Sequence, residues 1–353
     1  MRALISVYDK TGLEPFARGL AALGFEIVAS GGTAAALTND GLTVTPVEEV
    51  TGFPEVLGGR VKTLHPRIHA GILVRQDVPG DVAQLHEHAI SPFDLVCVNL
   101  YPFDATAELP GADEVDVLEM IDVGGPAMLR AAAKNHPHVV AVCRPQDYET
   151  VLSELREGKG AVSAEARRRL AGVAFSTTAA YEASIARWFQ RGVPFPETFV
   201  PAFRRVHELA YGENPHQRAA YYAERGARTH LLSYVEQLGG KPLSFNNLND
   251  LSAGRLLIRE LGSPACVIVK HANPCGVAVA ETVEEAYALA LAAGAPAAAA
   301  TVQYVDEGVD TGPVIESEPV PVLAGDTVET LRERVHAAEH RLLPKVVREL
   351  CAR

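Results

Sequence analysis

The strongest constraint on the fold is a repeated order of apolar runs and helical segments at the start of the chain. Leu4–Val7 is a short apolar run, and Leu13–Leu23 carries apolar residues at helical spacing. Residues 25–29 form a second apolar run, followed by the helical stretch 34–38. Strand, turn and helix repeated in this order predict an α/β fold with a parallel sheet flanked by helices.

The same alternation continues to about residue 190. Further strands are predicted at Asp94–Leu100 and Val139–Cys143. A Pro-rich segment, Gly192–Pro201, then predicts a domain boundary. The further predicted helices are Val115–Met120, Met128–Lys134, Tyr148–Leu155 and Ala164–Gln190.

Polar residues follow the first two predicted strands, where ligands bind in parallel α/β sheets. Lys10 follows the first strand, and Ser30-Gly31-Gly32-Thr33 follows the second. The glycines let the backbone approach a ligand, and the donors at the start of a helix can hold a phosphate. Ser or Thr beside glycines is also common at helix starts without any ligand. The pairing with Lys10 favours the phosphate site.

The stretch Gly59–Leu73 gathers cationic and titratable side chains in an otherwise acidic protein. Pro66 disfavours a helix through this point, so we expect a loop or a short bent element. A bound anion and a solvated basic loop both explain the stretch by itself, and both alternatives remain open. The cationic and titratable residues are Arg60, Lys62, His65, Arg67 and His69.

Composition narrows the range of partners. The chain has 353 residues with 32 Lys+Arg against 44 Asp+Glu, a formal net charge of -12 at pH 7. This acidic balance argues against a general nucleic-acid binder, although a local basic cluster still allows a small anionic ligand. The five cysteines form no CxxC pair, so we expect a reduced cytoplasmic protein without a metal site.

One uncharged stretch, Ala286–Val305, has about the length of a membrane span. It is mostly alanine and is interrupted by Gly294 and Pro296. Alanine drives insertion into a bilayer poorly, so a helix followed by a strand is the better interpretation. We therefore expect no membrane association.

Six motifs occur in order over about the first 200 residues: SVYDKTGL, ASGGTA, GRVKTLHPRIHAGIL, NLYPF, IDVGG and RAAAKNH. Together they resemble the cyclohydrolase half of the bifunctional purine-biosynthesis family that combines IMP cyclohydrolase with AICAR transformylase. The resemblance implies a methylglyoxal-synthase-like domain over residues 1–195. It also implies closure of formyl-AICAR to IMP with loss of water, without any cofactor.

The resemblance also implies roles for individual residues. The histidines His65 and His69 are predicted to be structural. The implied catalytic residues are Lys62, Tyr101, Asp122 and Lys134. The implied substrate-binding residues are Lys10, Ser30, Gly31, Gly32, Thr33, Arg60 and Thr63, with Asn99, Gly124 and Gly125 shaping the pocket for the base.

Two later motifs, Tyr211–Gln217 and Lys270–Gly276, resemble parts of the transformylase half. The resemblance implies a substrate contact at Tyr211 and a catalytic pair, Lys270 and His271, with 10-formyl-tetrahydrofolate as cosubstrate. Ala210 stands where that family usually has an arginine, and the motifs stop after Gly276. We therefore expect a partial, cytidine-deaminase-like transformylase domain over residues 196–292.

The last part of the chain, Thr301–Leu350, resembles the C-terminal part of a different enzyme, GAR transformylase. In this resemblance Asp310 matches the catalytic aspartate, and Gln303 replaces a usual histidine. We predict a foreign tail over residues 293–353, joined to the preceding domain near residues 289–296. We hypothesise an active cyclohydrolase, impaired formyl transfer, and a homodimer weakened by the truncation.

Two other functions are possible on the same fold. A methylglyoxal-synthase-like lyase would have no use for NLYPF, RVKTLHP and IDVGG together. A nucleotide-sensing domain without catalysis would bind nucleotide without turning it over. Turnover of formyl-AICAR separates both alternatives from a cyclohydrolase.

Overall fold

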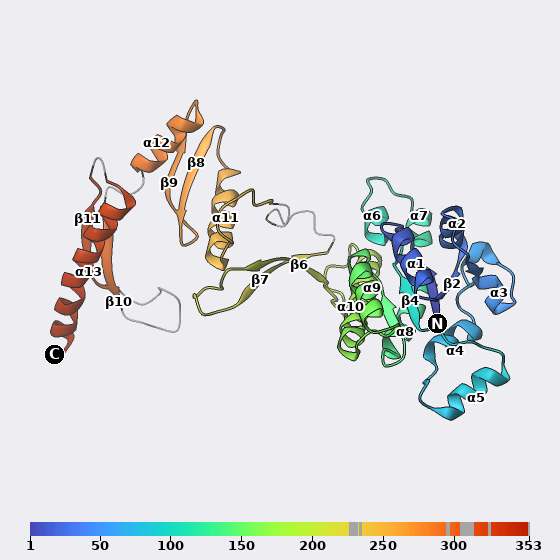
Figure 1. Ribbon diagram of the computed structural model, residues 1–353. Helices are drawn as coiled ribbons and strands as arrows, with labels where there is room; N and C mark the ends of the chain where they lie inside the picture. Colours follow the sequence, from blue (N-terminus) through green and yellow to red (C-terminus); the bar gives the residue numbers. More distant parts are fainter. Residues whose placement is uncertain (226–231, 233–234, 294–296, 304–313, 324–325, 352–353) are drawn as a thin grey trace. The chain divides into compact units, whose positions relative to one another are not determined.

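The computed structural model describes residues 1–225, 232, 235–293, 297–303, 314–323 and 326–351 (Figure 1). The chain divides into two compact units. Unit 1 comprises Met1–Arg204 and Ala223–Thr229, and unit 2 comprises Arg205–Tyr222 and His230–Arg353. The boundary expected at Gly192–Pro201 lies just before this division, while the three-domain division, with its second boundary between residues 292 and 293, stays a prediction.

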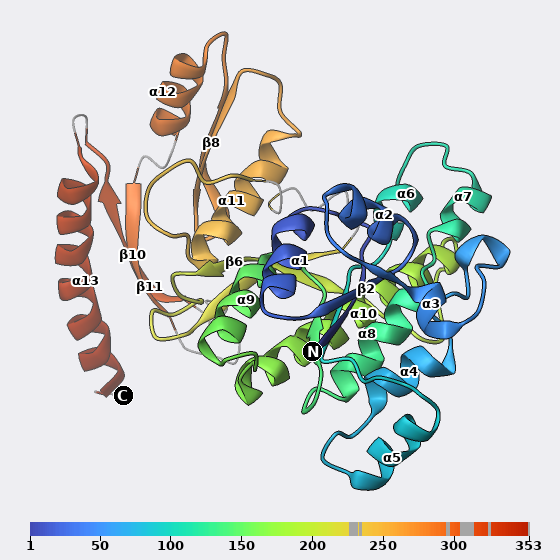
Figure 2. The same ribbon diagram turned by 45° about the vertical axis from the view of Figure 1, so that its right-hand side comes forward.

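Unit 1 is built on one sheet of five parallel strands in the order β3-β2-β1-β4-β5. The predicted parallel sheet is confirmed. β1 lies at its centre, and because the strands are parallel, the segments that follow β1, β2 and β4 meet at one edge. Figure 2 shows helices of unit 1 around β2. The strands are β1 (Arg2–Ser6), β2 (Glu26–Ala29), β3 (Thr45–Pro46), β4 (Leu95–Val98) and β5 (Val140–Val142).

Helices cover both faces of this sheet. Ala3 and Ile5 are buried on one face and Leu4 on the other, as the two-residue period of a strand requires. The chain thus forms three layers with a core on each side of the sheet. The first face is covered by α1 (Leu13–Ala22), α2 (Gly31–Asn39) and α9 (Tyr148–Glu157), and the second by α3 (Val47–Thr51), α4 (Pro66–Leu73), α8 (Gly124–Lys134) and α10 (Ala164–Phe189).

A third buried cluster joins the C-terminal half of α10 to the segment that follows β4. Its largest members are Phe103, Tyr181 and Trp188. This cluster places the short helices after β4 against α10. The remaining elements of unit 1 are η1 (Leu57–Gly59), α5 (Pro79–Glu87), α6 (Phe103–Ala107), α7 (Glu114–Glu119) and η2 (Pro145–Asp147).

The basic stretch Gly59–Leu73 is only partly the loop that the sequence predicts. Its second half is the helix α4, which begins at Pro66. The expectation of a loop or a short bent element was wrong for Pro66–Leu73, because proline fits the first helical position, where its missing N–H has no helical partner. His65 caps this helix, since its Nδ1 accepts a hydrogen bond from Arg67 N at 3.1 Å.

The rest of the described chain contains three separate two-stranded sheets. The β8–β9 and β10–β11 pairs are antiparallel. α13 packs on the last pair around Val320, Ala338 and Leu342. The strands are β6 (Phe203–Leu209), β7 (Ala219–Glu224), β8 (Ala265–Lys270), β9 (Asn273–Val279), β10 (Ala297–Gln303) and β11 (Val314–Pro321), and the helices are α11 (Phe245–Ile258), α12 (Val283–Ala293) and α13 (Val328–Cys351).

The alanine-rich stretch 286–305 contains the end of α12 and the strand β10, as predicted. Among the helices that the structure describes, none is both long enough and apolar enough to cross a bilayer.

Candidate active site

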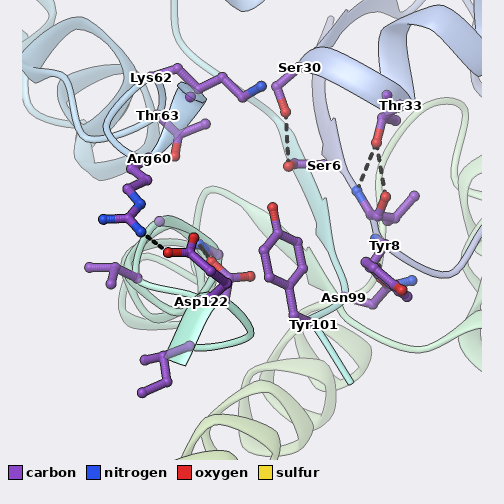
Figure 3. Close-up of a pocket in the computed structure, with 18 of the residues that line it drawn as sticks. Ser6, Tyr8, Ser30, Thr33, Arg60, Lys62, Thr63, Asn99, Tyr101 and Asp122 are labelled. Carbon is purple, nitrogen blue, oxygen red and sulfur yellow. Dashed lines mark hydrogen bonds and ion pairs between the residues drawn. The ribbon is translucent and has the colours of Figure 1, made fainter. Parts of the chain in front are cut away.

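A pocket of about 670 Å³ opens at the edge of the unit 1 sheet where β1, β2 and β4 end (Figure 3). Most of the substrate-binding and catalytic residues predicted in unit 1 line it. The basic stretch therefore faces a cavity, which favours the anion site over the solvated loop. The predicted residues that line the pocket are Lys10, Ser30, Gly32, Thr33, Arg60, Lys62, Thr63, Asn99, Tyr101, Asp122, Gly124 and Gly125.

Two helices begin at this pocket. α2 starts at Gly31 after Ser30, and α8 starts at Gly124. A helix start carries partial positive charge and free N–H groups, which favour a bound anion. Lys62 places its amine beside the start of α2, and this wall of the pocket suits a phosphate group.

The hydroxyl groups on this wall have different partners. Ser30 Oγ lies 3.0 Å from Ser6 Oγ, the last side chain of β1. The Thr33 hydroxyl accepts a hydrogen bond from Val7 N at 3.1 Å and donates one to Val7 O at 3.0 Å. Thr33 was predicted to hold phosphate, but its hydroxyl is bonded to the backbone of the β1 loop, so Thr33 shapes that loop.

Asn99 also shapes the loop after β1. Its side-chain oxygen accepts hydrogen bonds from Tyr8 N at 2.6 Å and Asp9 N at 3.0 Å, and its Nδ2 donates to Asp9 O at 2.8 Å. Lys10 Nζ folds back to Val7 O at 2.7 Å. Burial lowers the pKa of Lys10, against the attraction of the Asp9 carboxylate. Asn99, which follows β4, thus holds the loop after β1, and this loop places Lys10 at the pocket.

Lys62 lies against a glycine that leaves room for it. A β-carbon added to Gly31 would lie 2.5 Å from Lys62 Nζ. Gly31 also has a φ of +45°, in the left-handed region that favours glycine. Lys62 Nζ is 3.6 Å from Glu55 Oε2, a carboxylate that holds the amine near the start of α2.

Arg60, two residues earlier, is more exposed. Its side chain forms an ion pair with Glu119 at the end of α7. Exposed ion pairs contribute little to stability, so an anionic ligand can replace Glu119 as the partner of Arg60. The predicted ligand contact of Arg60 therefore requires this exchange.

Asp122 and Tyr101 form the opposite wall. Burial raises the pKa of Asp122 above its usual 3.8, although Gly125 N donates a hydrogen bond to its Oδ1 at 2.7 Å. Burial, the Asp122 charge and Tyr8 raise the pKa of Tyr101, whose ring meets that of Tyr8 edge to face at 5.5 Å. Within the described chain, no hydrogen bond holds the Tyr101 hydroxyl, which points toward the open centre of the pocket (Figure 3).

The paired glycines at the start of α8 allow two close approaches. A β-carbon on Gly124 would lie 2.4 Å from Thr63 Oγ1, and one on Gly125 would lie 2.3 Å from Asp122 Oδ2. These contacts join the basic stretch, α8 and Asp122 around the pocket. The spacing of Asp122 and the two glycines thus has a steric cause.

The two histidines of the basic stretch have structural roles, as predicted. His65 caps α4. Burial lowers the pKa of His69, against a hydrogen bond with the backbone of Thr63. Both side chains fix the chain on either side of Pro66.

Lys134 is not brought to the pocket. It is exposed at the C-terminal end of α8, whose first residue is at the pocket. At a rise of 1.5 Å per residue, ten residues place it about 15 Å along the helix from Gly124. Its catalytic role stays a prediction that this arrangement does not support.

The predicted site residues of the second half lie in unit 2. Lys270 and His271 are exposed at the tip of the β8–β9 hairpin. Asp250 Oδ1 accepts a hydrogen bond from Ala272 N at 2.6 Å in the same turn. Tyr211 is partly buried, and its carbonyl accepts a hydrogen bond from Phe245 N at 3.1 Å. Asp310 lies outside the described residues.

Sequence reasoning missed three residues at or near the pocket. Ser6 and Tyr8 line it. Both lie at the end of the first strand, so the rule that ligands bind at the ends of parallel strands, which located Lys10, could also have located them. Tyr181 donates and accepts hydrogen bonds around Asp122 from the middle of α10. No signal in the sequence of that helix points to Tyr181.

The fold and pocket agree with the comparisons to known proteins. Residues 12–127 match the family of MGS-like domains, the class that the parallel sheet and its edge pocket define. Residues 132–311 match the AICARFT/IMPCHase bienzyme family, and the chain belongs to that family. Residues 284–347 match the formyl transferase family, whereas the likeness of the tail to the C-terminal part of GAR transformylase stays a prediction.

Two relatives of known name, both proteins called PurH, support the same assignment. The chain is 51% identical over 292 residues to the bifunctional purine biosynthesis protein PurH of Lacticaseibacillus paracasei, covering 83% of this chain and 57% of the relative. It is 50% identical over 288 residues to PurH of Halalkalibacterium halodurans, covering 81% and 56%. The chain thus spans little more than half the length of these relatives. The crystal structure of ForH matches with a TM-score of 0.49 at 42% identity, covering 54% of this chain and 96% of that one.

Proposed function

We propose that unit 1 is an IMP cyclohydrolase, which closes formyl-AICAR to IMP with loss of water. The observation that carries this proposal is one pocket with a phosphate-binding wall opposite two proton-carrying groups, Asp122 and Tyr101. Membership in the AICARFT/IMPCHase bienzyme family supports it. In de novo purine biosynthesis this step supplies IMP.

The substrate phosphate binds at the start of α2, with Ser30, Gly31, Gly32, Lys10 and Lys62 around it. The amine of Lys62 also balances negative charge that develops during the reaction. This placement directs the rest of the nucleotide toward Tyr101 and Asp122.

Ring closure requires proton transfers in both directions. The carboxamide nitrogen attacks the formyl carbon and loses a proton, and the formyl oxygen gains one. The resulting hydroxyl then leaves as water after a second proton transfer. Tyr101, whose raised pKa keeps it protonated, donates to the formyl oxygen while Asp122 accepts a proton from the carboxamide nitrogen. Asp122 returns its proton to the hydroxyl, which leaves as water, and the proton lost by the formamido nitrogen as the ring double bond forms restores Tyr101. Thr63 lies against Gly124, where the basic stretch meets the start of α8.

Formyl transfer from 10-formyl-tetrahydrofolate is the second activity of the family, and we propose that it is impaired in this chain. Lys270 and His271 are exposed at a hairpin tip, without the burial that tunes catalytic groups. Ala210 precedes Tyr211, where an arginine contact was expected. Of the groups expected to act in formyl transfer, Lys270 and His271 are therefore exposed and the arginine is missing.

The proposed setting is cytoplasmic, and the proposed assembly is a weakened homodimer. Free, buried thiols at Cys97 and Cys143 are compatible with a reducing compartment. Light scattering after size exclusion tests the assembly. A strict monomer at high concentration would contradict a dimer.

IMP formation from formyl-AICAR tests the activity directly. Lys62→Ala and Tyr101→Phe should each lower the rate by a factor on the order of 100, the usual cost of a lost electrostatic or acid–base group. Arg67→Ala is the matched control, because it removes a cation of the same stretch that does not line the pocket. Nucleotide binding without turnover in the unaltered chain would favour the sensing domain, and methylglyoxal formation would favour the lyase.

A further inference from the structure

The hydroxyl of Tyr181 holds the backbone beside Asp122. It accepts a hydrogen bond from Asp122 N at 2.8 Å and donates one to Met120 O at 2.6 Å. Tyr181 is 4% exposed, and its ring meets Phe103 edge to face at 6.2 Å. The hydroxyl therefore has a fixed position under the connection between α7 and α8.

This connection leaves backbone groups that the two helices cannot satisfy. Met120 follows the last residue of α7, and Asp122 precedes the N-cap of α8. Carbonyl groups after a helix and N–H groups before one have no partner within the helix. A hydroxyl donates and accepts at once, so one tyrosine satisfies both groups.

We propose that Tyr181 is a positioning residue for Asp122 in the reaction assigned to this pocket. The inference rests on the proposed function. Tyr181 does not line the pocket and acts through Asp122. Tyr181 fixes the backbone of Asp122, and Gly125 N fixes its Oδ1 at 2.7 Å. The second carboxylate oxygen, Oδ2, then has one position from which to exchange a proton.

Tyr181→Phe removes the hydroxyl and keeps the ring in its cluster. The kcat for IMP formation should fall by a factor on the order of 10 to 100, because a loosened catalytic group is costly even when displaced by about 1 Å. The KM and the affinity for IMP should stay near their original values, because the phosphate wall is untouched. This division between kcat and KM separates positioning from general destabilisation.

Ser184→Ala is the matched control on the same helix. Ser184 is buried, and its hydroxyl donates to Ala180 O of α10 at 3.2 Å. This variant loses a buried hydroxyl without affecting Asp122, so its kcat should stay close to the original. Equal kcat values for Tyr181→Phe and Ser184→Ala would overturn the role of Tyr181 while leaving the proposed function intact.

Amide hydrogen exchange gives a readout that does not depend on turnover. In the unaltered chain the Asp122 amide should exchange slowly, and in Tyr181→Phe it should exchange faster. An Asp122 amide that exchanges like an unfolded peptide in the unaltered chain would overturn the inference. Absence of IMP formation by the unaltered chain would instead reject the proposed function, and exchange would still report on the Tyr181 contact.

Discussion

Unit 1 and the described part of unit 2 differ in how they bury their side chains. In unit 1 the five strands share one sheet, and large residues such as Phe16, Phe93 and Ile5 are fully buried. In unit 2 the described strands form separate pairs, and the residues of β8 and β9 are almost all exposed or half-buried. A two-stranded sheet is marginally stable by itself. Unit 1 can therefore hold a site rigidly on its own core, whereas the described part of unit 2 offers less support.

The same difference separates the two sets of predicted catalytic residues. Asp122 lies between Gly125 and the Tyr181 contact and has a raised pKa caused by burial. Lys270 and His271 are exposed at a hairpin tip. Burial and fixed neighbours are what shift the pKa of a catalytic group. A motif thus supplies the residue types, and the surrounding core fixes their positions and shifts their pKa values.

The largest expected effect is on the stability of unit 1. Phe16 is 1% exposed and stacks on Tyr148 at 4.2 Å between ring centroids. Phe16→Ala should lower the free energy of unfolding of unit 1 by about 3–5 kcal/mol. Trp188, the single tryptophan of the chain, lies in unit 1, so its fluorescence follows this transition.

Leu342→Ala provides the counterpart in the tail. Leu342 is 3% exposed in the small cluster of α13 and β11. Loss of the Leu342 side chain should leave the unfolding transition detected by Trp188 fluorescence unchanged. It should change the far-ultraviolet circular dichroism signal that comes from the tail. A shift of the Trp188 transition as large as that of Phe16→Ala would show that the two units unfold together and would contradict a separate core in unit 1.

A smaller effect is expected where a glycine gives room to Asp122. Gly125→Ala would place a β-carbon 2.3 Å from Asp122 Oδ2, and the displaced carboxylate should lower the rate of IMP formation by a factor on the order of 100. The control in unit 2 is Gly254→Ala in α11, where the half-buried Val269 lies 3.1 Å away and can shift. Its rate of IMP formation should be unchanged, and a matching loss in both variants would contradict a local clash.

The smallest effect is a pair of opposite pH responses. Because burial raises the pKa of Asp122, the folded chain binds this proton more tightly than the unfolded chain. This contribution to stability is complete below pH 3.8 and is lost as the pH rises through the folded-state pKa. Asp122→Asn should flatten that fall in Trp188-detected unfolding measured between pH 3 and 7. An unchanged pH slope in this variant would rule out the raised pKa.

Asp326 in the tail should respond in the opposite direction. A hydrogen bond from Arg334 holds the pKa of Asp326 well below its usual 3.8. Its stabilising contribution is therefore present above that value and is lost as the pH falls. Circular dichroism of the tail in Asp326→Asn should lose its acid sensitivity, while the Trp188 transition keeps its own pH dependence.

Much of unit 1 could be predicted from the sequence because strands and helices there follow local patterns. The strand-end rule located Lys10 and Ser30, and the family resemblance added Lys62, Tyr101 and Asp122, which the structure brings to one pocket. Their convergence follows from the parallel sheet, which aligns strand ends that are far apart in the sequence.

Other features depend on tertiary contacts that local patterns do not contain. The position of Lys134 depends on the direction of α8, which carries it away from the pocket. The hydroxyl of Thr33 is bonded to Val7, a contact between the start of α2 and the loop after β1. The helix at Pro66 was a missed local signal, since proline favours the first position of a helix.

The close approach of Gly31 and Lys62 has a consequence for how this chain can change. The lysine amine occupies the space that a side chain at position 31 would need. A side chain at position 31 would push the lysine amine away from the start of α2, and the φ of +45° disfavours any residue other than glycine there. Replacement of Gly31 would therefore change this region in two ways at once, through strain in the backbone of α2 and through the position of the charge beside it.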